Sequence, residues 1–377
     1  MTKVGILLDM AGAYGRSVLR GVMHFAQVSQ LAHDWEFVMP PMYSLARKAT
    51  IDPSHSDGIV AMVHDERSIA AFRGHGVPVV NTARTLSLKR LWSAKIPSVV
   101  PDDGAIGEMA YRYLRERGFT RFGFCGHPTA DWSLARHRAF ARCCADDGLA
   151  CASVTRADEV PVKWVSQLPK GTAVLAANDR YAWHAVDACR LADRRVPDDI
   201  AVLGVDNDPL IVNMIRPALS SVELPGFRIG IEAGTLLADL LRDRSKAVRP
   251  RLFPPTAVIG RASTDVLAIE DDAVVEAVRF VRSNAARRIS VNDVVEAVAL
   301  SRRNLERRFR KVMGRSLLEE IRQARLDRAK QLLRETTLEM PAVARESGYS
   351  SAVRFSTVFH AAEGMPPTAF RRLHRHR

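Results

Sequence analysis

The sequence is poor in the features that mark membrane and secreted proteins. Aromatic residues make up 7% of its 377 residues, and it contains no run of about 18 apolar residues, the length that a membrane-spanning helix needs. Its first residues, Met1, Thr2 and Lys3, lead directly into an apolar stretch, without the basic and apolar regions of a signal peptide. We therefore expect a cytoplasmic protein that has no membrane partner.

Cysteine is also scarce. The five cysteines are odd in number and none of them forms a CxxC pair, which argues against both a disulfide framework and a zinc site. They fall in apolar or helical segments, as reduced thiols in the core of a cytosolic protein do. We expect no metal and no cofactor. These residues are Cys125, Cys143, Cys144, Cys151 and Cys189.

Common catalytic signatures are missing as well. HExxH, GxSxG, GxGxxG and the phosphate-binding loop do not occur in the chain. We therefore predict no catalytic residue and expect that the protein is not an enzyme. A sugar-modifying enzyme remains a less favoured alternative, with Asp103 and Asp206 as an acid/base pair and His127 as a base.

What the chain has in excess is positive charge, and this excess is unevenly distributed. The net charge is +13. Residues 271–377 carry 22 Lys and Arg against 13 Asp and Glu, a net charge of +9, whereas the other 270 residues carry 33 against 29, a net charge of +4. A basic carboxyl-terminal region of this kind is typical of a surface that binds the phosphates of DNA.

Two stretches within this basic region repeat each other. In each, apolar residues at helical spacing predict a short helix, a turn of about three residues and a second helix that starts at a serine. The offset between paired positions changes from 49 to 50, so the second turn carries one extra residue. Two helix-turn-helix units are therefore predicted. The pairs are Val291, Val294, Leu300 and Ser301 with Met340, Val343, Tyr349 and Ser350, and then Leu305 and Phe309 with Phe355 and Phe359.

The second helix of each unit is the part expected to read DNA. In the first unit Leu305 and Phe309 lie on the predicted buried stripe, and arginines lie on the opposite one, where their forks can bind guanine edges or phosphates. The second unit offers fewer long donors and more methyl groups. We predict DNA contacts from Arg302, Arg303, Glu306, Arg307 and Arg310 in the first unit, and from Ser351, Val353, Arg354 and Thr357 in the second.

At these residues the chain resembles the DNA-binding domain of the arabinose-operon regulator (AraC) family. The resemblance covers residues 271–377 and is carried by the linking helix at 325–333, the turn at 347–350 and the stretch 355–371. It implies an all-α domain with two helix-turn-helix units and promoter DNA as a partner. The chain departs from the pattern at Pro341, which falls in the first turn of a helix, where proline is tolerated.

The first 260 residues have a different pattern, in which short apolar runs alternate with amphipathic helices. Such alternation predicts parallel sheets flanked by helices, and the length fits two such units with a cleft between them. The expected strands include 4–8, 58–62, 77–80, 122–125, 173–176 and 200–205, and the expected helices include 15–27, 106–117, 133–146 and 180–192.

Polar residues follow several of these strands, where they would line the cleft. Carboxylates, an amide and an arginine supply acceptors and donors for hydroxyl groups, and a tryptophan offers a face for C–H groups. This combination is typical of a site for a polyol. The predicted effector-binding residues are Asp9, Asp103, Trp132, Arg136, Asn178 and Asp206.

Four short strings within this region resemble the sugar-binding core of the lactose-repressor (LacI/GalR) family. They contain Asp102-Asp103-Gly104, Arg136, Asn178-Asp179 and Gly204-Val205-Asp206-Asn207. The resemblance implies a periplasmic-binding-protein type I fold with two lobes. It also implies that Asp103, Arg136, Asn178 and Asp206 contact the effector.

That family carries its DNA reader before the sugar-binding core, whereas here the first strand is expected to begin by Val4, so we expect no reader before it. The order of the parts, together with Ala13-Tyr14-Gly15-Arg16 and the stretch 261–265, resembles the family of bacterial xylose-operon activators. This implies an effector domain at 1–265 and a DNA-binding domain at 266–377. It also implies a homodimer, RNA polymerase as a partner and D-xylose as the leading effector. A ligand-independent architectural DNA-binding protein remains an alternative.

Overall fold

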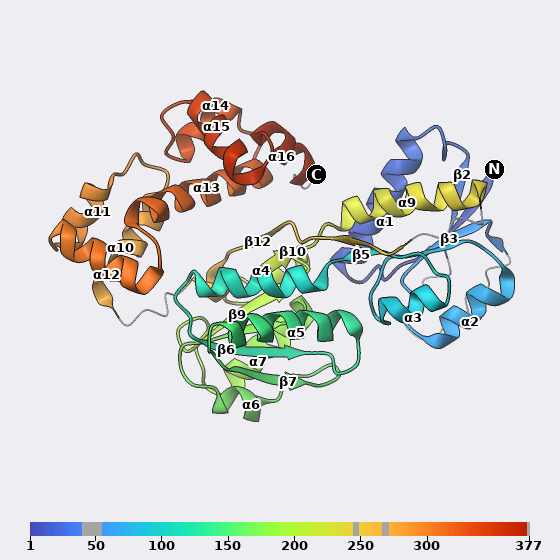
Figure 1. The fold of residues 1–377 in the computed structure, drawn as a ribbon, viewed down its shortest axis with the longest axis horizontal. Helices are drawn as coiled ribbons and strands as arrows, with labels where there is room; N and C mark the ends of the chain where they lie inside the picture. The colour runs from blue at the N-terminus through green and yellow to red at the C-terminus, as the bar shows by residue number, and fades with distance from the viewer. Residues whose placement is uncertain (40–54, 244–248, 266–270, 375–377) are drawn as a thin grey trace. The chain divides into compact units, whose positions relative to one another are not determined.

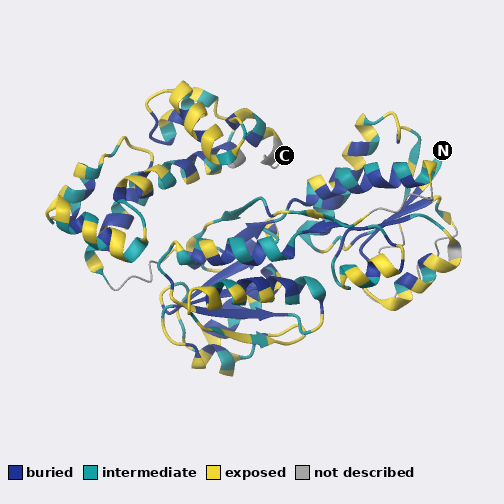
Figure 2. Cartoon of the chain, viewed as in Figure 1, coloured by how far each residue is buried: buried dark blue, intermediate teal, exposed yellow. Residues whose placement is uncertain are grey.

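The computed structural model of the protein describes residues 1–39, 55–243, 249–265 and 271–374. These divide into two compact units, one formed by the described residues up to 115 and from 119 to 265, and the other by residues 116–118 and 271–374. Figure 2 shows buried residues gathered in the strands and on the inner faces of the helices. Among the described residues, no helix is both long enough and apolar enough to cross a membrane.

The first unit begins with a lobe built on a four-stranded parallel sheet. The strand order is β2-β1-β3-β4, and every pair is parallel. Side chains alternate along β3, so that Val60 packs into the core beneath α1 and α9 while Ile59 and Ala61 pack against α2 and α3 on the opposite face. The elements are β1 (Thr2–Leu7), α1 (Ala13–Val28), β2 (Trp35–Val38), β3 (Gly58–Ala61), α2 (Glu66–His75), β4 (Val79–Asn81), α3 (Leu88–Ser93) and α9 (Gly226–Arg242).

Helices α1 and α9 lie side by side over this sheet (Figure 1), and glycines let them approach closely. A Cβ atom on Gly21 would lie 2.1 Å from the carbonyl oxygen of Phe227, and one on Gly230 would lie 2.1 Å from that of Val18. No larger side chain fits at either position without moving a backbone. Glycine is therefore required here for packing, not for an unusual backbone angle.

The second lobe is a six-stranded sheet with the order β12-β10-β9-β8-β6-β7, parallel except where β12 pairs with β10. The chain crosses between the lobes after β5 (Val99–Pro101), before α9, and after β11 (Arg251–Phe253), which pairs with β5. The other elements are α4 (Asp103–Arg115), β6 (Arg121–Gly126), α5 (Asp131–Asp146), β7 (Cys151–Thr155), α6 (Val162–Gln167), β8 (Thr172–Ala176), α7 (Asp179–Leu191), β9 (Ile200–Val205), α8 (Pro209–Met214), β10 (Ser220–Glu223), β12 (Ala257–Ile259) and the short helix η3 (Ala262–Thr264).

All six expected strands and all four expected helices of this unit are present, within a few residues of their predicted ends. The strands that the sequence pattern did not reveal are β2, β5, β7, β10, β11 and β12. Most of these have only three or four residues, too few to display an alternating or continuous apolar pattern. The two-lobed parallel α/β fold was thus predicted correctly from its central strands.

The second unit is entirely helical among its described residues and contains two hydrophobic clusters. The first cluster gathers α10, α11, α12 and the start of α13, and the second gathers the end of α13 with α14, α15 and α16. Helix α13 therefore belongs to both (Figure 1). The helices are α10 (Asp272–Ser283), α11 (Val291–Val298), α12 (Arg302–Met313), α13 (Leu317–Glu335), α14 (Met340–Glu346), α15 (Ala352–Glu363) and α16 (Pro367–His374).

The repeat seen in the sequence is confirmed as two helix-turn-helix units, α11 with α12 and α14 with α15. The turns contain left-handed residues at Ala299 and Gly348, 49 positions apart, whereas the second helices begin at Arg302 and Ala352, 50 positions apart. Counted from the left-handed residue to the start of the second helix, the second turn is therefore one residue longer, as predicted. Pro341 lies in the first turn of α14, where the missing backbone N–H breaks no intrahelical bond.

Candidate functional site

A cavity of about 320 Å³ lies between the two lobes of the first unit, within the usual range for small-molecule sites. The structure brings all six predicted effector residues to it. Carboxylates outnumber guanidinium groups among its lining residues, so hydrogen-bond acceptors dominate the site. The charged lining residues are Asp9, Asp103, Asp179, Asp206 and Asp208 with Arg84, Arg136 and Arg180.

A buried ion pair forms one wall of this cavity. Arg136, on α5, donates from Nε to Oδ1 of Asp103 at 2.8 Å and from Nη1 to the carbonyl oxygen of Ala177 at 2.5 Å. The other carboxylate oxygen, Oδ2, is buried and accepts no hydrogen bond from any described residue, although Arg84 Nη1 lies 3.9 Å away. Burial raises the pKa of Asp103 in spite of both arginines. This oxygen can accept a ligand hydroxyl without losing a protein partner.

Trp132 lies one helical turn before Arg136 on α5, and the guanidinium carbon of Arg136 is 5.1 Å from the centre of its ring. That contact fits a cation–π interaction, which holds both groups in place. The tryptophan is only partly buried and lines the cavity. Its ring can therefore pack against the C–H groups of a ligand while Arg136 remains bound to Asp103.

Asn178 and its neighbour Asp179 are used partly for structure. The Asn178 side chain caps α7 by accepting a hydrogen bond from the backbone N–H of Tyr181 at 3.0 Å, which leaves its Nδ2 group for a ligand. Asp179 is buried and accepts from Ser221 Oγ at 2.6 Å and from the Asp208 backbone N–H at 2.7 Å. Burial, followed by the nearby Asp206, raises its pKa well above the ordinary value.

Asp206 occupies the most unusual position in the cavity. Its φ angle is 110°, a value that non-glycine residues rarely adopt and that often marks a functional site. Burial raises its pKa to about 7, with Arg136 opposing the shift and Asp208, Asp103 and Asp9 adding to it. None of the hydrogen bonds described in the structure uses its carboxylate. The group therefore faces the cavity as an uncommitted acceptor.

Two ion pairs that include cavity-lining residues join the two lobes. Asp208 accepts from Arg16 Nη2 at 3.0 Å and from the Ala13 backbone N–H at 2.9 Å, both on the opposite lobe. Arg84 donates from Nε to Asp131 of the other lobe at 2.6 Å. The cleft is therefore closed, and opening it would break both ion pairs.

In the DNA-binding unit, most of the residues predicted to read DNA are on the exposed side of α12. Arg303 and Arg310 are exposed. Arg307 is also exposed and donates to Asn304 at 3.3 Å. Arg302 is paired with Glu306 at 3.0 Å, so these two side chains partly satisfy each other. The helix thus presents several positive groups and one internal ion pair.

Helix α15 presents a less polar surface at the corresponding positions. Val353 is 77% exposed, so its methyl groups are available at the surface of the helix. Arg354 and Thr357 are exposed beside it, and the Thr357 hydroxyl donates to the Val353 carbonyl at 3.1 Å. Ser351 caps the helix, because its Oγ accepts from the Arg354 backbone N–H at 3.2 Å. Its oxygen therefore accepts within the helix, while its O–H group can still donate to a DNA phosphate.

Comparison with known proteins agrees with both parts of the chain. Residues 111–264 match the family of periplasmic binding protein-like domains, and residues 294–373 match the helix-turn-helix domain family. The xylose operon regulatory protein of Escherichia coli K12 is 31% identical, covering 98% of this chain and 96% of that protein. Its Haemophilus influenzae counterpart is 29% identical, covering 98% of each. The chain belongs to the family of xylose operon regulatory proteins.

A solved structure supports the same assignment. It is described as that of the xylose-binding transcription activator xylR, and it matches with a TM-score of 0.62 and 29% identity, covering 99% of this chain and 98% of that one. The protein is accordingly a sugar-responsive, DNA-binding transcription regulator. Its effector unit has the periplasmic-binding-protein fold, and its carboxyl-terminal unit has the AraC-type double helix-turn-helix.

Several lining residues of the regulator's cavity were not predicted from the sequence. Tyr14 donates its hydroxyl to the Thr82 carbonyl at 2.6 Å, and burial raises its pKa. His64 and Arg84 follow β3 and β4, the position that identified the other site residues, so the same rule applied to these strands would have found them. Met62 gave no such signal, because it continues the apolar run of β3.

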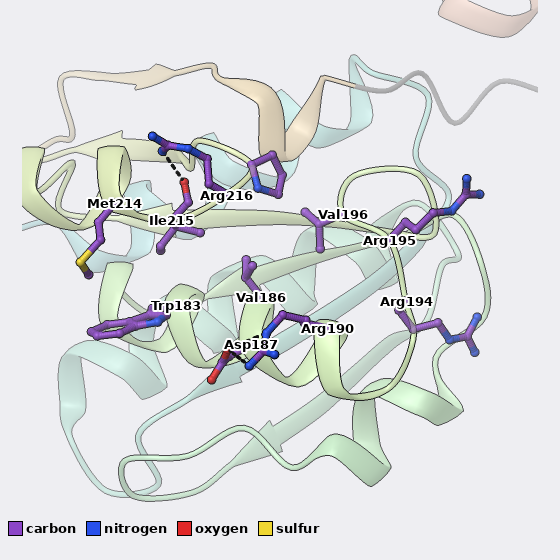
Figure 3. A pocket seen from close by; sticks show the side chains of 11 residues that line it. Trp183, Val186, Asp187, Arg190, Arg194, Arg195, Val196, Met214, Ile215 and Arg216 are labelled. Atoms are coloured by element: carbon purple, nitrogen blue, oxygen red, sulfur yellow. Dashed lines mark hydrogen bonds and ion pairs between the residues drawn. The ribbon is translucent and has the colours of Figure 1, made fainter.

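A second cavity of the regulator, of about 450 Å³, lies along one face of α7 (Figure 3). Its only lining carboxylate, Asp187, is bound by Arg190 at 2.9 Å. Arg216 donates to the Ile215 carbonyl at 3.1 Å. Trp183 and Met214 supply apolar surface. None of the predicted effector residues lines it, and its polar groups do not converge on a common point. The cavity between the lobes is therefore the better candidate for a sugar site.

Proposed function

We propose that the regulator binds D-xylose or a closely related pentose in the cavity between its lobes. The main observation that supports this is the pair of uncommitted acceptors, Asp103 Oδ2 and the Asp206 carboxylate, beside the fixed Trp132 ring. Known members of the family are named for the xylose operon. The effector-binding residues of the proposal are Asp9, Asp103, Trp132, Arg136, Asn178 and Asp206.

In the proposed complex the sugar donates hydroxyl protons to the carboxylates and accepts from Asn178 and Arg136. Its C–H groups pack on the ring of Trp132. Each bond is made in a site from which water is displaced, so an unpaired sugar hydroxyl or carboxylate would be costly. The Arg16–Asp208 and Arg84–Asp131 pairs keep the lobes closed around the ligand. The sugar shifts the protein toward the closed state only as far as it binds that state more tightly.

At the DNA, we propose that residues 266–377 form the reading domain and residues 1–265 the effector domain of a cytoplasmic homodimer. Each protomer would insert α12 and α15 into successive major-groove segments, about 10 base pairs apart. The proposed contacts come from Arg302, Arg303, Glu306, Arg307 and Arg310 on α12, and from Ser351, Val353, Arg354 and Thr357 at α15. RNA polymerase would be recruited to the promoter, which makes the protein an activator.

Calorimetric titration with a panel of pentoses and hexoses tests the effector. We expect D-xylose to bind more tightly than any hexose and to remain unchanged after incubation. Asp206→Asn should weaken binding by about 1.5–3 kcal/mol, because a charge-assisted hydrogen bond is lost. Asp187→Asn, in the second cavity, is the matched control and should bind the sugar as the unmodified protein does.

Three results would count against the proposal. A folded Asp206→Asn protein with full sugar affinity would remove this residue from the site. Consumption of the sugar would favour an enzyme. If no sugar bound and DNA affinity were the same in every sugar, the ligand-independent architectural alternative would be preferred.

Footprinting tests the arrangement on DNA. Two protected segments per protomer on one face of the duplex are expected, and four for a dimer. Protection of a single segment per protomer would contradict the use of both units. Analytical ultracentrifugation with and without D-xylose would establish whether the protein is a dimer under the conditions of the footprint.

A further inference from the structure

The three residues that follow β9 make three different connections. Asp206 and Asn207 both have positive φ angles, 110° and 49°, so the backbone here is bent in a way that costs energy for residues other than glycine. Such a bend persists only where surrounding contacts hold it. The contacts of the two residues and of Asp208 therefore show what the bend connects.

The outer two residues of the bend face the ligand cavity and the opposite lobe. Asp206 lines the cavity. Asp208 binds Arg16 and the Ala13 N–H on the other lobe, and it also caps α8 by accepting from the Leu210 N–H at 3.0 Å. Ligand binding and lobe closure thus act on positions only two residues apart.

The middle residue, Asn207, faces neither of these. Its backbone N–H donates to Ser221 Oγ at 3.0 Å, and its Nδ2 donates to Glu223 at 3.3 Å, next to a crossing between the lobes. Its Oδ1 accepts from Nη2 of Arg261 at 2.8 Å. The other terminal nitrogen of Arg261 donates to the Leu219 carbonyl at 2.9 Å. One guanidinium group therefore links the bend to the start of β10.

Arg261 is followed directly by η3, the last element of the effector unit. Ser263 Oγ donates to the Val202 carbonyl at 2.6 Å. Thr264 Oγ1 is 2.8 Å from the Tyr113 hydroxyl and 2.6 Å from Ser220 Oγ. Residues 261–264 are thus fixed to the second lobe just before the chain continues into the DNA-binding unit.

We propose that Asn207 and Arg261 are positioning residues that pass the effect of sugar binding from the bend at 206–208 to the chain segment that enters the DNA-binding unit. This inference rests on the proposed sugar site. A sugar bound at Asp206, with the lobes closed at Asp208, fixes both ends of the bend and so sets the position of the Asn207 amide. Because the Arg261 guanidinium group is bound to the Asn207 amide, a change in the position of that amide changes the position of Arg261 and of η3, which follows it.

The geometry of Arg261 makes it suited to this task. Its planar group binds two partners in fixed directions, which the single ammonium of lysine cannot reproduce. Any displacement of Asn207 relative to Leu219 must therefore strain or break one of the two bonds. Neither Asn207 nor Arg261 lines the cavity. Removing their contact should therefore leave the sugar affinity unchanged but reduce the effect of the sugar on DNA affinity.

The test uses the full-length protein, D-xylose and a duplex carrying the footprinted promoter segment. Asn207→Gly removes the amide but permits the left-handed backbone, and Arg261→Lys keeps the charge but not the fork. For each protein, calorimetry gives sugar affinity, and fluorescence anisotropy gives DNA affinity with and without saturating D-xylose. Hydrogen exchange of residues 259–265 is followed in the same states. Arg216→Lys is the control, because Arg216 also donates to backbone carbonyls of this lobe but does not touch the bend.

We expect both variants to bind D-xylose within about threefold of the unmodified protein. In the unmodified protein the sugar should change DNA affinity by about 5- to 150-fold, the usual range of allosteric coupling. In Asn207→Gly this change should fall below about twofold, and the sugar should no longer alter hydrogen exchange at 259–265. Arg261→Lys should be intermediate, and Arg216→Lys should behave as the unmodified protein does.

Two results would overturn the inference. A full sugar-dependent change in DNA affinity in Asn207→Gly, or in Arg261→Lys if the first variant does not fold, would mean that the contact transmits nothing. A loss of sugar affinity beyond about tenfold, or 1.4 kcal/mol, would mean that the pair acts on the cavity itself. Failure of the proposed function looks different, because then the unmodified protein would not bind D-xylose or would not respond to it.

Discussion

The two helix-turn-helix units have the same arrangement of helices, but they differ in how the start of the first helix and the turn are stabilised. In the first, α11 starts with a capping box in which Ser290 and Asp293 satisfy each other's backbone N–H groups, and its turn places Ala299 in a left-handed conformation. In the second, α14 starts at Glu339 without a side-chain cap, and its turn uses Gly348. The first unit is better stabilised at its start, and the second has the less strained turn.

Their reading helices differ in the same complementary way. Helix α12 exposes Arg303, Arg307 and Arg310, whereas α15 exposes Val353 and a single arginine, Arg354. Hydrogen-bond donors can distinguish guanine, and methyl groups can contact thymine. The comparison indicates that a duplicated motif can divide polar and apolar readout between its copies. The predictions below test these differences between the two units, from the largest expected effect to the smallest.

Gly348→Ala should be the most damaging change in either turn. A Cβ atom there would lie 2.7 Å and 2.8 Å from the backbone carbonyls of Arg287 and Ala285, and φ is 74°. Because backbone must move, we expect a loss of at least about 2–3 kcal/mol in the free energy of unfolding, measured by urea denaturation. Gly364→Ala, at φ 69° with nothing within 4 Å, is the control and should cost about 1 kcal/mol. Equal losses would show that packing around Gly348 is unimportant.

Arg307→Ala should weaken binding to the specific operator by about 1–3 kcal/mol and relax base preference at one position, if the side chain contacts guanine. If it contacts phosphate alone, binding should weaken uniformly across sequences, with a smaller salt dependence. Competition binding on single-base operator variants at two salt concentrations separates these outcomes. Arg354→Ala is the matched change in α15 and should cost less. A greater loss of specificity in Arg354→Ala would refute the proposed division between the readers.

Ser290→Ala should lower the free energy of unfolding by about 1 kcal/mol, because the capping box at the start of α11 is lost. The second unit offers the reverse experiment. Glu339→Ser introduces a capping side chain where the structure has none, and a gain of about 0.5 kcal/mol or more is expected. Thermal unfolding of both variants checks the pair. No gain in Glu339→Ser would mean that α14 does not need a cap.

Ala299→Gly should have the smallest effect, and its sign should be opposite to that of Gly348→Ala. At a φ of 53° the Cβ atom of Ala299 is unfavourable. Glycine relieves this strain but gains freedom in the unfolded chain, so a net stabilisation of up to about 1 kcal/mol is expected. Thermal denaturation measures it. A clear destabilisation would indicate that the Ala299 methyl group contributes to packing.

Features of the fold and the site could be predicted from the sequence where they depend on residues that are close together in the chain. The repeat at 291–309 and 340–359 defines both helix-turn-helix units because apolar spacing and serine caps are properties of neighbouring residues. The cavity residues could be proposed because polar side chains follow buried strands, a rule that the position of Asp206 after β9 illustrates.

Contacts between distant parts of the chain could not be predicted in this way. Arg16 and Asp208 are 192 positions apart, and no local pattern connects them. The antiparallel pairing of β12 with β10 is another case, since three residues carry too little pattern to define an edge strand.

In the proposed sugar site, the raised pKa of Asp206 would link sugar binding to protons. The ordinary pKa of this carboxyl is 3.8, and burial raises it to about 7 in the folded protein. Between these values the folded protein holds a proton that the unfolded chain releases, so the stability contributed here falls as pH rises. Hydroxyl donors of the proposed sugar favour the ionised carboxylate and would expel that proton. Affinity should therefore increase as pH rises toward about 7 and level off above it. Calorimetry in buffers of different ionisation enthalpy would detect proton release, and Asp206→Asn should abolish it.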